Sequence, residues 1–534
     1  MLKQLLFHGG IALFSCTSVC SQVTFQETFG GPGIDYGYYI DQTLDSGYII
    51  GGYTYSFGSG DRDVYLIRID KNADTLWTKA YGGTNIDYAY VVLQTSDGGF
   101  IAGAHSESFG AGSHDIYIIK TDENGDTMWT KAYGGPTPDG VYSMQQTADD
   151  GYILASHTSS YGAGQHEVYL IKTDPNGNVS WTRTYGESGG DYLRSIDQTS
   201  DGGYIMVSES ESFGAGGFDV YVIKTDSKGD LEWTRTYGGT GADYGYFIQQ
   251  TSDDGYIIAG YTNSFGAGSF DAYLIRTDGN GDTLWTKTYG GSSADYAYSV
   301  QQTNDGGFIL SGYSESFGTG GDVYVIRTDE QGDTLWTKVY GGPQSDRGWT
   351  IQQTFDKGYI IAGFTESFGA GNMDVYIIKI DSNGHSGCNE RGTATIVSNT
   401  NTVVDTTATV VDSGVTVNTT ETITSNTTTE LDLLCDSQVV NSIRAISLDH
   451  AKVFPNPFDI ATTIELKLAG DYELTFSLYN ILGIEVTTRV SSSLSRESED
   501  VRFVLHRDKL VPGIYFYKIT THNKTLDSGK IVLN

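Results

Sequence analysis

The chain of 534 residues is long enough for more than one domain, and its 66 acidic and 32 basic residues give a formal net charge of −34. A surface this acidic repels the phosphate backbone of nucleic acids and discourages binding to anionic lipid, so neither is an expected partner. Beyond the first 21 residues no segment is long and apolar enough to cross a membrane as a helix, so we expect no transmembrane segment.

Residues 1–21 have the features of a signal peptide that is removed on secretion. Lys3 supplies the positive start, an apolar stretch follows, and small residues precede a cut after Ser21. A lipid anchor on Cys16 or Cys20 is the alternative.

Residues 22–387 consist of seven copies of a unit of about 52 residues. A glycine marks the same point in every copy: Gly47, Gly99, Gly151, Gly203, Gly255, Gly307 and Gly358. A tryptophan marks another point in six copies: Trp77, Trp129, Trp181, Trp233, Trp285 and Trp336. The seventh copy lacks this last piece, but residues 24–31 match residues 76–83, with Phe25 in place of the tryptophan. A repeat array that begins with the final piece of its own unit is expected to close into a ring.

Each unit predicts four short β-strands. In the fifth unit, runs rich in Tyr, Ile, Val and Thr occupy residues 244–251, 256–262, 272–277 and 283–289, and Gly, Asn, Asp and Ser separate them. Four-stranded units repeated about an axis form a β-propeller. We therefore expect an all-β chain with a seven-bladed β-propeller, in which the N-terminal strand at residues 23–29 completes and closes the last blade.

Asp122, Gly125 and Trp129 form a pattern similar to the tryptophan-docking turn of quinoprotein-type propellers. No cofactor-binding pattern accompanies it, so no cofactor is implied. Each tryptophan is expected to wedge between neighbouring blades as part of the core.

Residues 388–436 differ in composition, because Thr, Val and Asn dominate. Apolar residues recur about every seven positions, at Ile396 and Val397, Val403 and Val404, Val410 and Val411, and Val417. This spacing predicts ordered short strands, and a small β-module of hairpins and an extended stalk are both open. Cys388 and Cys435 flank the segment, and an even pair of cysteines in an exported chain suggests a disulfide between them.

A linker at residues 437–450 leads to a domain at residues 451–534 that we expect to be a small β-sandwich. Four sequence pieces reach the chain end in order: Pro455-Asn456-Pro457, the stretch from Leu478 to Gly483, the strand from Gly513 to Lys518, and Gly529-Lys530-Ile531-Val532. These pieces and their order strongly resemble the type A C-terminal sorting domain of the type IX (Por) secretion system of Bacteroidota. The resemblance implies that the type IX machinery exports the protein across the outer membrane of a Gram-negative bacterium, either to the cell surface or into the medium.

Two acidic residues per unit are expected on one face of the propeller. The first set lies at the start of each first strand: Asp35, Asp87, Asp139, Asp191, Asp243, Asp295 and Asp346. The second set precedes the third strand: Asp63, Asp115, Glu167, Asp219, Asp271, Asp322 and Asp374. Clustered carboxylates suit Ca²⁺, which makes calcium a candidate cofactor and the first set its candidate ligands. The alternative is that each acid caps a glycine-rich loop, and recurrence in every blade favours this structural role.

Units two to four depart from the sevenfold pattern on the same face, at positions that several other units fill with aromatic residues. The departing residues are His105, His114, His157, His166, Arg194 and Glu209. They form the candidate ligand-binding patch, and drift among exposed aromatic residues is the alternative. Neighbouring blades are expected to hold equivalent residues about 10 Å apart, too far for shared metal coordination.

Two sequence signatures of catalysis are missing, since the chain has neither a His-Glu-x-x-His motif nor a phosphate loop. We therefore expect a monomeric, non-enzymatic binding or adhesion protein, secreted or on the cell surface, that recognises an extracellular glycan or protein. A polysaccharide hydrolase or lyase and a purely structural surface protein are the alternatives.

Overall fold

The computed structural model describes residues 22–400 and, beyond them, residues 402–405, 410–412, 416–419, 423–426, 430–436, 452–454, 461–468, 474–480, 485–491, 499–506, 510, 513–521 and 524–533. Every regular element among these residues is a β-strand, and none of them forms a helix that could cross a membrane. The signal peptide and linker predicted at residues 1–21 and 437–450 lie outside the described residues. The chain divides into two compact units between Gln438 and Val439.

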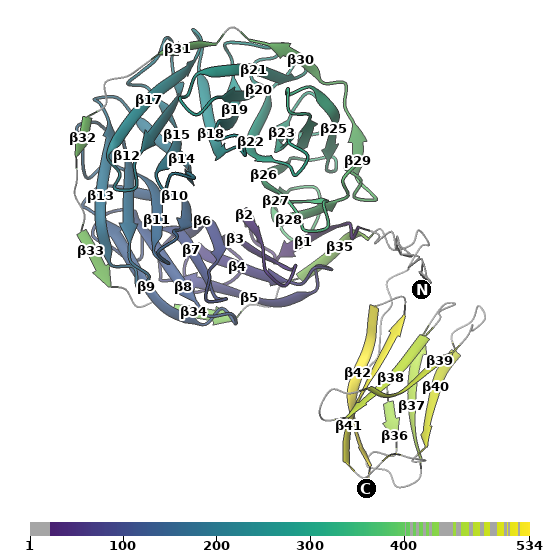
Figure 1. Ribbon diagram of the computed structural model, residues 1–534. Coiled ribbons are helices and arrows are strands. Elements are labelled where there is room, and N and C mark those ends of the chain that lie inside the picture. The colour runs from purple at the N-terminus through teal and green to yellow at the C-terminus, as the bar shows by residue number, and fades with distance from the viewer. Residues whose placement is uncertain are drawn as a thin grey trace, which may run out of the picture. The chain divides into compact units, whose positions relative to one another are not determined.

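Seven antiparallel blades surround a central axis, which confirms the seven-bladed β-propeller (Figure 1). The innermost strands are β2 (Asp35–Gln42), β6 (Asp87–Gln94), β10 (Asp139–Gln146), β14 (Asp191–Gln198), β18 (Asp243–Gln250), β22 (Asp295–Gln302) and β26 (Asp346–Gln353). The second strands are β3 (Tyr48–Thr54), β7 (Phe100–Ser106), β11 (Tyr152–Thr158), β15 (Tyr204–Ser210), β19 (Tyr256–Thr262), β23 (Phe308–Ser314) and β27 (Tyr359–Thr365). The third strands are β4 (Asp63–Ile69), β8 (Asp115–Thr121), β12 (Glu167–Thr173), β16 (Asp219–Thr225), β20 (Asp271–Thr277), β24 (Asp322–Thr328) and β28 (Asp374–Ile380). The fourth strands of the first six blades are β5 (Thr75–Gly82), β9 (Thr127–Gly134), β13 (Val179–Gly186), β17 (Leu231–Gly238), β21 (Thr283–Gly290) and β25 (Thr334–Tyr340).

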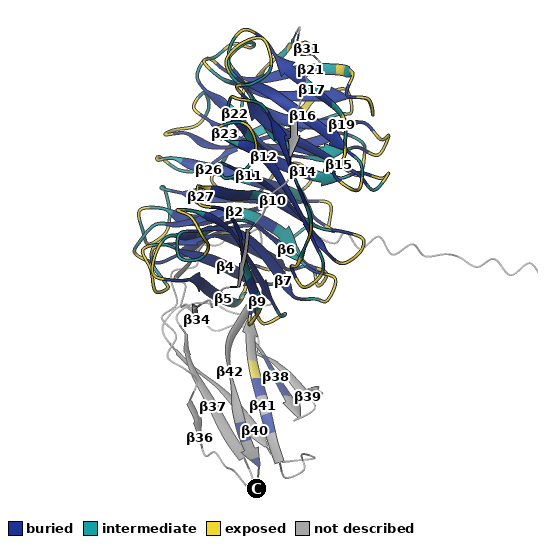
Figure 2. Cartoon of the chain, turned by 90° about the vertical axis from the view of Figure 1, so that its left-hand side faces the viewer, coloured by how far each residue is buried: buried dark blue, intermediate teal, exposed yellow. Residues whose placement is uncertain are grey.

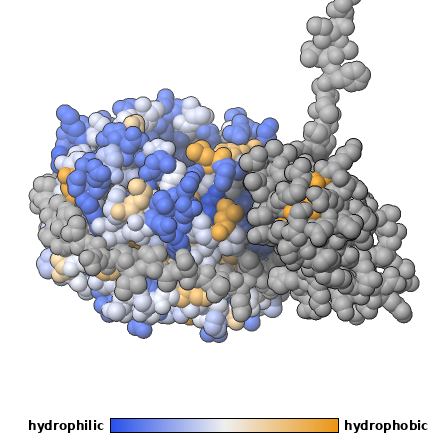
Figure 3. Space-filling model, turned by 90° about the horizontal axis from the view of Figure 1, so that it is seen from below, coloured by the Kyte–Doolittle hydropathy of each residue, from blue (hydrophilic) through white to orange (hydrophobic). Residues whose placement is uncertain are grey.

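The middle strands of each blade are buried along almost their whole length, while the loops are exposed (Figure 2). Each blade packs against a neighbour on both faces, so both faces need apolar side chains. In β4, for example, Val64 and Leu66 join the core shared with the second blade, while Tyr65 and Ile67 join the core shared with the last blade. The visible rim is mainly hydrophilic, as the acidic composition predicts (Figure 3).

The fourth strand of the last blade comes from the N-terminus. β1 (Phe25–Gly30) pairs antiparallel with β28, with Phe29 opposite Val375. Phe25 and Phe29 are buried in a core that also contains Ile377. The start and end of the repeat region therefore share one sheet.

Each tryptophan of the repeat links its blade to the next one, as the sequence predicts. The indole nitrogen of Trp77 donates a hydrogen bond to the backbone oxygen of Glu123 at 3.2 Å, and the Tyr81 hydroxyl donates to the backbone oxygen of Gly125 at 2.6 Å. Gly125 has a φ of +74°, and a Cβ there would lie 3.0 Å from the Trp77 ring. Only glycine therefore fits this turn without strain.

The segment that follows the propeller adds a fifth strand to every blade. Its strands are β29 (Glu390–Gly392), β30 (Ile396–Asn399), β31 (Val403–Asp405), β32 (Val410–Asp412), β33 (Thr416–Thr419), β34 (Ile423–Asn426) and β35 (Glu430–Asp436), together called the belt. They pair in turn with β25, β21, β17, β13, β9, β5 and β1. The belt thus runs around the whole rim against the order of the blades (Figure 1).

The hairpin module and the stalk expected for residues 388–436 are both wrong. The strands are short, as predicted, but each pairs with a blade and not with another belt strand. A four-stranded blade leaves the backbone groups of its outer strand without partners on the rim side, and the belt satisfies part of this edge.

The seven-residue period of the belt matches the distance between blades at the rim. If the inner strands lie roughly 10 Å from the axis and strands are about 4.8 Å apart, the fifth strand lies roughly 29 Å out, where neighbouring blades are roughly 25 Å apart. Seven extended residues span about 23–25 Å. The register repeats as well, because Val397, Val404 and Val411 each lie opposite the equivalent outer-strand tyrosine of their blades.

The C-terminal unit contains two described sheets. One has the order β36 (Lys452–Phe454), β37 (Ala461–Leu468), β40 (Glu499–His506), and the other β39 (Glu485–Ser491), β38 (Leu474–Asn480), β41 (Gly513–Thr521), β42 (Lys524–Leu533). Alternate residues of the second sheet are buried, including Phe476 and Leu478, Tyr515 and Tyr517, and Ile531 and Leu533. One face of that sheet is therefore covered, and the sandwich stays a prediction.

Candidate functional site

The inner strands place a closed ring of seven side chains around the propeller axis. This axial ring consists of the fourth residue of each inner strand: Tyr38, Tyr90, Tyr142, Arg194, Tyr246, Tyr298 and Trp349. Neighbouring aromatic centroids lie 4.4–5.6 Å apart around the ring. The Arg194 guanidinium carbon completes the circle at 5.0 Å from the rings of both Tyr142 and Tyr246.

A β-bulge turns each member of the axial ring towards the axis. In the first blade, Gly37 pairs with Gly52 and Tyr39 pairs with Gly51, so Tyr38 is an extra residue in the strand. The same one-residue shift occurs in all seven inner strands. A bulge bends its strand and re-aims the extra side chain, which frees this position from the alternation of the strand.

The axial ring encloses a cavity of about 260 Å³, which we call the cup. Tyr39 and Phe247 line both the cup and a second cavity of about 150 Å³ on the axis. The other five blades carry smaller residues at this position: Val91, Ser143, Ser195, Ser299 and Thr350. Ser143 and Thr350 also line both cavities, and Tyr39 and Phe247 are the two large side chains of the floor between them.

Arg194 is held in the axial ring by an ion pair. Its Nη2 donates to Oε1 of Glu209, whose residue is 5% exposed. Burial lowers the pKa of Arg194, but the charge and hydrogen bond of Glu209, together with Tyr246 and Tyr142, outweigh this effect and raise that pKa well above its usual value. The guanidinium thus stays charged, lies between two tyrosine rings and has its charge balanced by a buried carboxylate.

The histidines of the candidate patch are mostly packed against one another. His105 and His157 have ring centroids 6.1 Å apart, and His157 and His166 are 5.5 Å apart. The expected separation of about 10 Å is therefore wrong for the first pair, since the inner ends of the blades converge towards the axis. His114 instead contacts Glu107, with its Nε2 2.9 Å from Oε1 of that carboxylate.

His105 is a buried, neutral packing residue. Its Nε2 lies 3.0 Å from the Val141 carbonyl oxygen, and its Nδ1 lies 3.1 Å from the Tyr88 hydroxyl. Its ring fills the space over Gly140, where other blades carry a larger residue. Burial lowers the pKa of His105 to about 3 and that of His157 well below its usual value. Both imidazoles are therefore uncharged at neutral pH.

The repeated acids lie under the loops at the junctions between blades. The candidate calcium ligands begin the inner strands and are at most 1% exposed: Asp35, Asp87, Asp139, Asp191, Asp243, Asp295 and Asp346. Oδ2 of Asp139, for example, accepts hydrogen bonds from the Gly135 N–H at 2.7 Å and the Ser160 hydroxyl at 2.8 Å. These contacts support the capping role. No group of three or more metal-ligating side chains occurs among the described residues, and calcium binding stays a prediction.

The floor of the cup was missed by the sequence analysis, although a signal was present. Tyr39 and Phe247 are large where five sister units have small residues, immediately after the ring position. The sequence did identify Arg194 as the exception at the ring position, and Glu209 as an exception on the second strand of the same unit. The structure shows that these two exceptions form one ion pair.

Residues 452–534 match the family described as the secretion system C-terminal sorting domain, which confirms the predicted type IX sorting domain. This domain indicates export to the cell surface or secretion, and it implies contact with the type IX machinery. The chain is also similar to the regulatory protein FlaEY of Caulobacter vibrioides, with 26% identity over 238 residues, 39% of this chain and 24% of that protein. The chain thus spans about a quarter of that relative's length.

Two solved structures of the trimeric ectodomain of the C. elegans fusion protein EFF-1, one of them a mutant, have a weak similarity to the chain. Their identities are 7% and 8%, they cover 95% of this chain and 98% and 96% of theirs, and both have a TM-score of 0.12. A TM-score this low carries no argument about fold or function.

Proposed function

We propose that this exported propeller is a non-enzymatic binding protein whose cup holds the terminal sugar of an extracellular glycan. The observation that carries the proposal is the axial ring itself, with six aromatic side chains and one guanidinium around a cavity of about 260 Å³. Pockets for small ligands are mainly aromatic and apolar, with a few polar groups that fix orientation. Aromatic faces stack on the apolar faces of sugar rings, while Arg194 and the tyrosine hydroxyls offer hydrogen bonds.

The size of the cup favours a sugar over a protein ligand. Its volume of about 260 Å³ equals that of about nine liquid-water molecules, which is room for one sugar-sized ring. A stable protein interface instead needs about 800 Å² from each partner. The floor formed by Tyr39 and Phe247 favours entry of a chain end over threading of a whole chain.

A glycan array probed with the protein spanning residues 22–534 tests this proposal. We expect Trp349→Ala and Tyr142→Ala to weaken glycan binding by at least about tenfold, because each removes a central aromatic contact. Phe355→Ala is the matched control, since this aromatic side chain is 66% exposed and lies outside the cup. Unchanged binding by both ring variants would remove the cup as the site.

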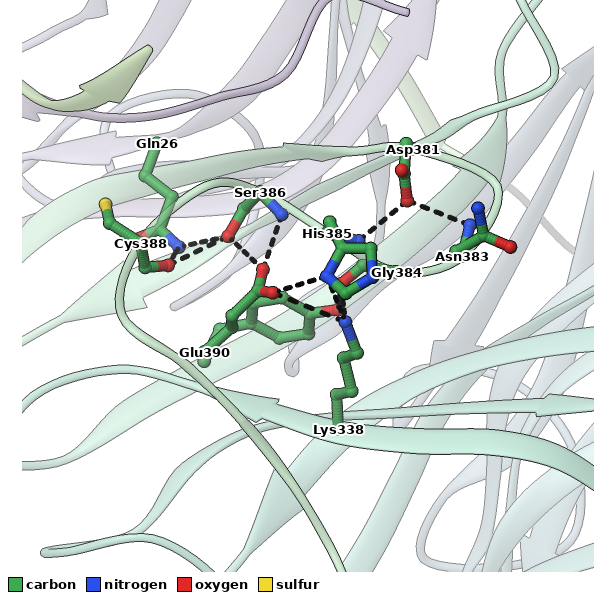
Figure 4. A network of polar contacts seen from close by, with 10 residues as sticks. Gln26, Lys338, Asp381, Asn383, Gly384, His385, Ser386, Cys388 and Glu390 are labelled. Carbon is green, nitrogen blue, oxygen red and sulfur yellow. Dashed lines mark hydrogen bonds and ion pairs between the residues drawn. The ribbon is translucent and has the colours of Figure 1, made fainter. Parts of the chain in front are cut away.

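We also propose that the belt is fastened by the disulfide expected between Cys388 and Cys435. Gln26 lies between the two ends of the belt. Its Nε2 donates to the Cys388 carbonyl oxygen at 2.6 Å (Figure 4), and its backbone pairs with Cys435. The bond would close a loop around the rim. In the chain-entropy treatment, such a loop of nearly 50 residues stabilises the folded protein by about 4 kcal/mol.

A further inference from the structure

We infer that Glu209 sets the charge preference of the cup, so that the cup selects uncharged terminal sugars over acidic ones. The inference rests on the proposed function and adds the class of ligand. Among the described residues that line the cup, Arg194 alone is charged, and its charge is cancelled by the Glu209 carboxylate.

An unpaired arginine in this position would favour acidic ligands. A free guanidinium offers a planar fork of N–H donors that binds a carboxylate through two parallel hydrogen bonds. In this cup, the Nη2 of Arg194 already donates to Glu209. An incoming carboxylate would therefore share one cation with a second, buried carboxylate, and the two like charges would repel each other at low dielectric.

The surroundings of Arg194 leave it suited to hydroxyl groups. Tyr142 and Tyr246 flank the guanidinium, whose carbon lies 5.0 Å from the centroid of each ring. We therefore expect a ligand to contact its N–H groups instead of stacking on it. A sugar hydroxyl accepts one hydrogen bond there without bringing a charge. The net charge of −34 repels acidic glycans at longer range.

Glu209 is also unusual among the seven blades. The equivalent positions carry Tyr53, His105, His157, Tyr261, Tyr313 and Phe364. The one acidic residue at this level therefore occurs in the blade that carries the one arginine of the axial ring. A cup built only to bind acidic sugars would need Arg194 without this partner.

The test compares matched neutral and acidic sugars. The probes are the p-nitrophenyl glycosides of glucose, galactose and mannose and of the three corresponding uronic acids, which differ only by a carboxylate. They are titrated into the protein spanning residues 22–534, its Glu209→Gln variant and a Glu123→Gln control. Glu123 is exposed on the opposite face, so the control makes the same chemical change away from the cup.

We expect the unmodified protein and the control to bind the neutral member of a recognised pair at least about tenfold more tightly than the acidic member. Glu209→Gln should raise the affinity for the acidic member at least about tenfold, because the Arg194 charge is then no longer balanced by a buried carboxylate that repels an acidic ligand. Glu209→Tyr, which introduces the residue of the fifth blade, should act in the same direction and serves if Glu209→Gln does not fold. Binding with an unchanged ratio in the folded variant would overturn this inference alone. Absence of binding to all six sugars would overturn the proposed function together with it.

Discussion

The first prediction concerns Gln26, the residue that joins the closing strand to the start of the belt. Its side chain is fully buried, and its Nε2 donates to the Ser386 hydroxyl at 2.8 Å and to the Cys388 carbonyl oxygen at 2.6 Å. Its Oε1 accepts from the Tyr376 hydroxyl at 2.6 Å and from Nδ2 of Asn389 at 3.1 Å. Gln26→Ala removes all four hydrogen bonds while keeping the backbone of β1.

The expected loss in the free energy of unfolding is about 2–4 kcal/mol. Each of the four hydrogen bonds contributes about 1 kcal/mol net. The lower value of about 2 kcal/mol allows for partners that keep other hydrogen bonds in the variant. The Cys388 carbonyl oxygen still accepts from the Ser386 hydroxyl at 2.9 Å, and that hydroxyl also contacts Glu390. The folded ring is large, so this loss lowers the melting temperature by only about 2–5 °C.

The sharper assay is hydrogen exchange, because the belt should open locally before the blades unfold. We expect faster exchange in residues 388–400 and in the β1 backbone, with little change in β10–β13 on the far side of the ring. Gln165→Ala is the matched control, since Gln165 is exposed on a loop. Equal exchange at the belt and a melting temperature within 1 °C of the unmodified protein would refute the role assigned to Gln26.

Three further predictions test the ring and its junctions. Deletion of residues 23–29 should abolish a cooperative melting transition, because both β28 and β35 lose the strand between them; a sharp transition at the original temperature would contradict this. Cys388→Ser should lower the free energy of unfolding by about 4 kcal/mol in chemical denaturation without reductant, and equal stability of the variant and the unmodified protein would exclude the disulfide. Burial, with the nearby Asp191 charge, raises the pKa of Glu167 to about 7, so the folded state binds a proton that the unfolded state releases at a lower pH. Stability should therefore rise as the pH falls from 8 to 6, and Glu167→Gln should reduce this rise; an identical slope in the variant would show that Glu167 does not titrate in this range.

The blades could be predicted from the sequence because the repeat makes local signals unmistakable. Seven glycine-marked turns and strands of ordinary length fixed the number of blades, and the matched fragment around Phe25 placed the N-terminal strand beside the last unit. The belt could not be predicted in the same way. Its strands have three to seven residues, and their partners lie up to about 400 positions away in the chain, so neither length nor local pattern identifies them. Only the seven-residue spacing carried information, and it fitted several arrangements.

The sequence predicted which residues of the candidate site depart from the repeat, but not how those residues contact one another. Sequence comparison of the units singles out Arg194 and Glu209, yet only the structure shows that they neutralise each other. The bulge at each ring position is also invisible in the sequence, because it is a shift in pairing between two strands. The histidines illustrate the opposite error, since His105 departs from the pattern but fills the space over Gly140 as a packing residue.

Residues that depart from the sevenfold symmetry would let the axial ring of the proposed site distinguish one ligand from another. Seven equal side chains around an axis would offer the same contacts in seven orientations, so they could not distinguish the hydroxyl pattern of one sugar from that of another. Arg194 on one side of the cup, with Tyr39 and Phe247 on its floor, removes this equivalence. All three lie on inner strands whose ladders, turns and inter-blade contacts follow the repeat. Substitutions at these three positions can therefore change the contacts that the cup offers while the strand pairing of the ring is kept.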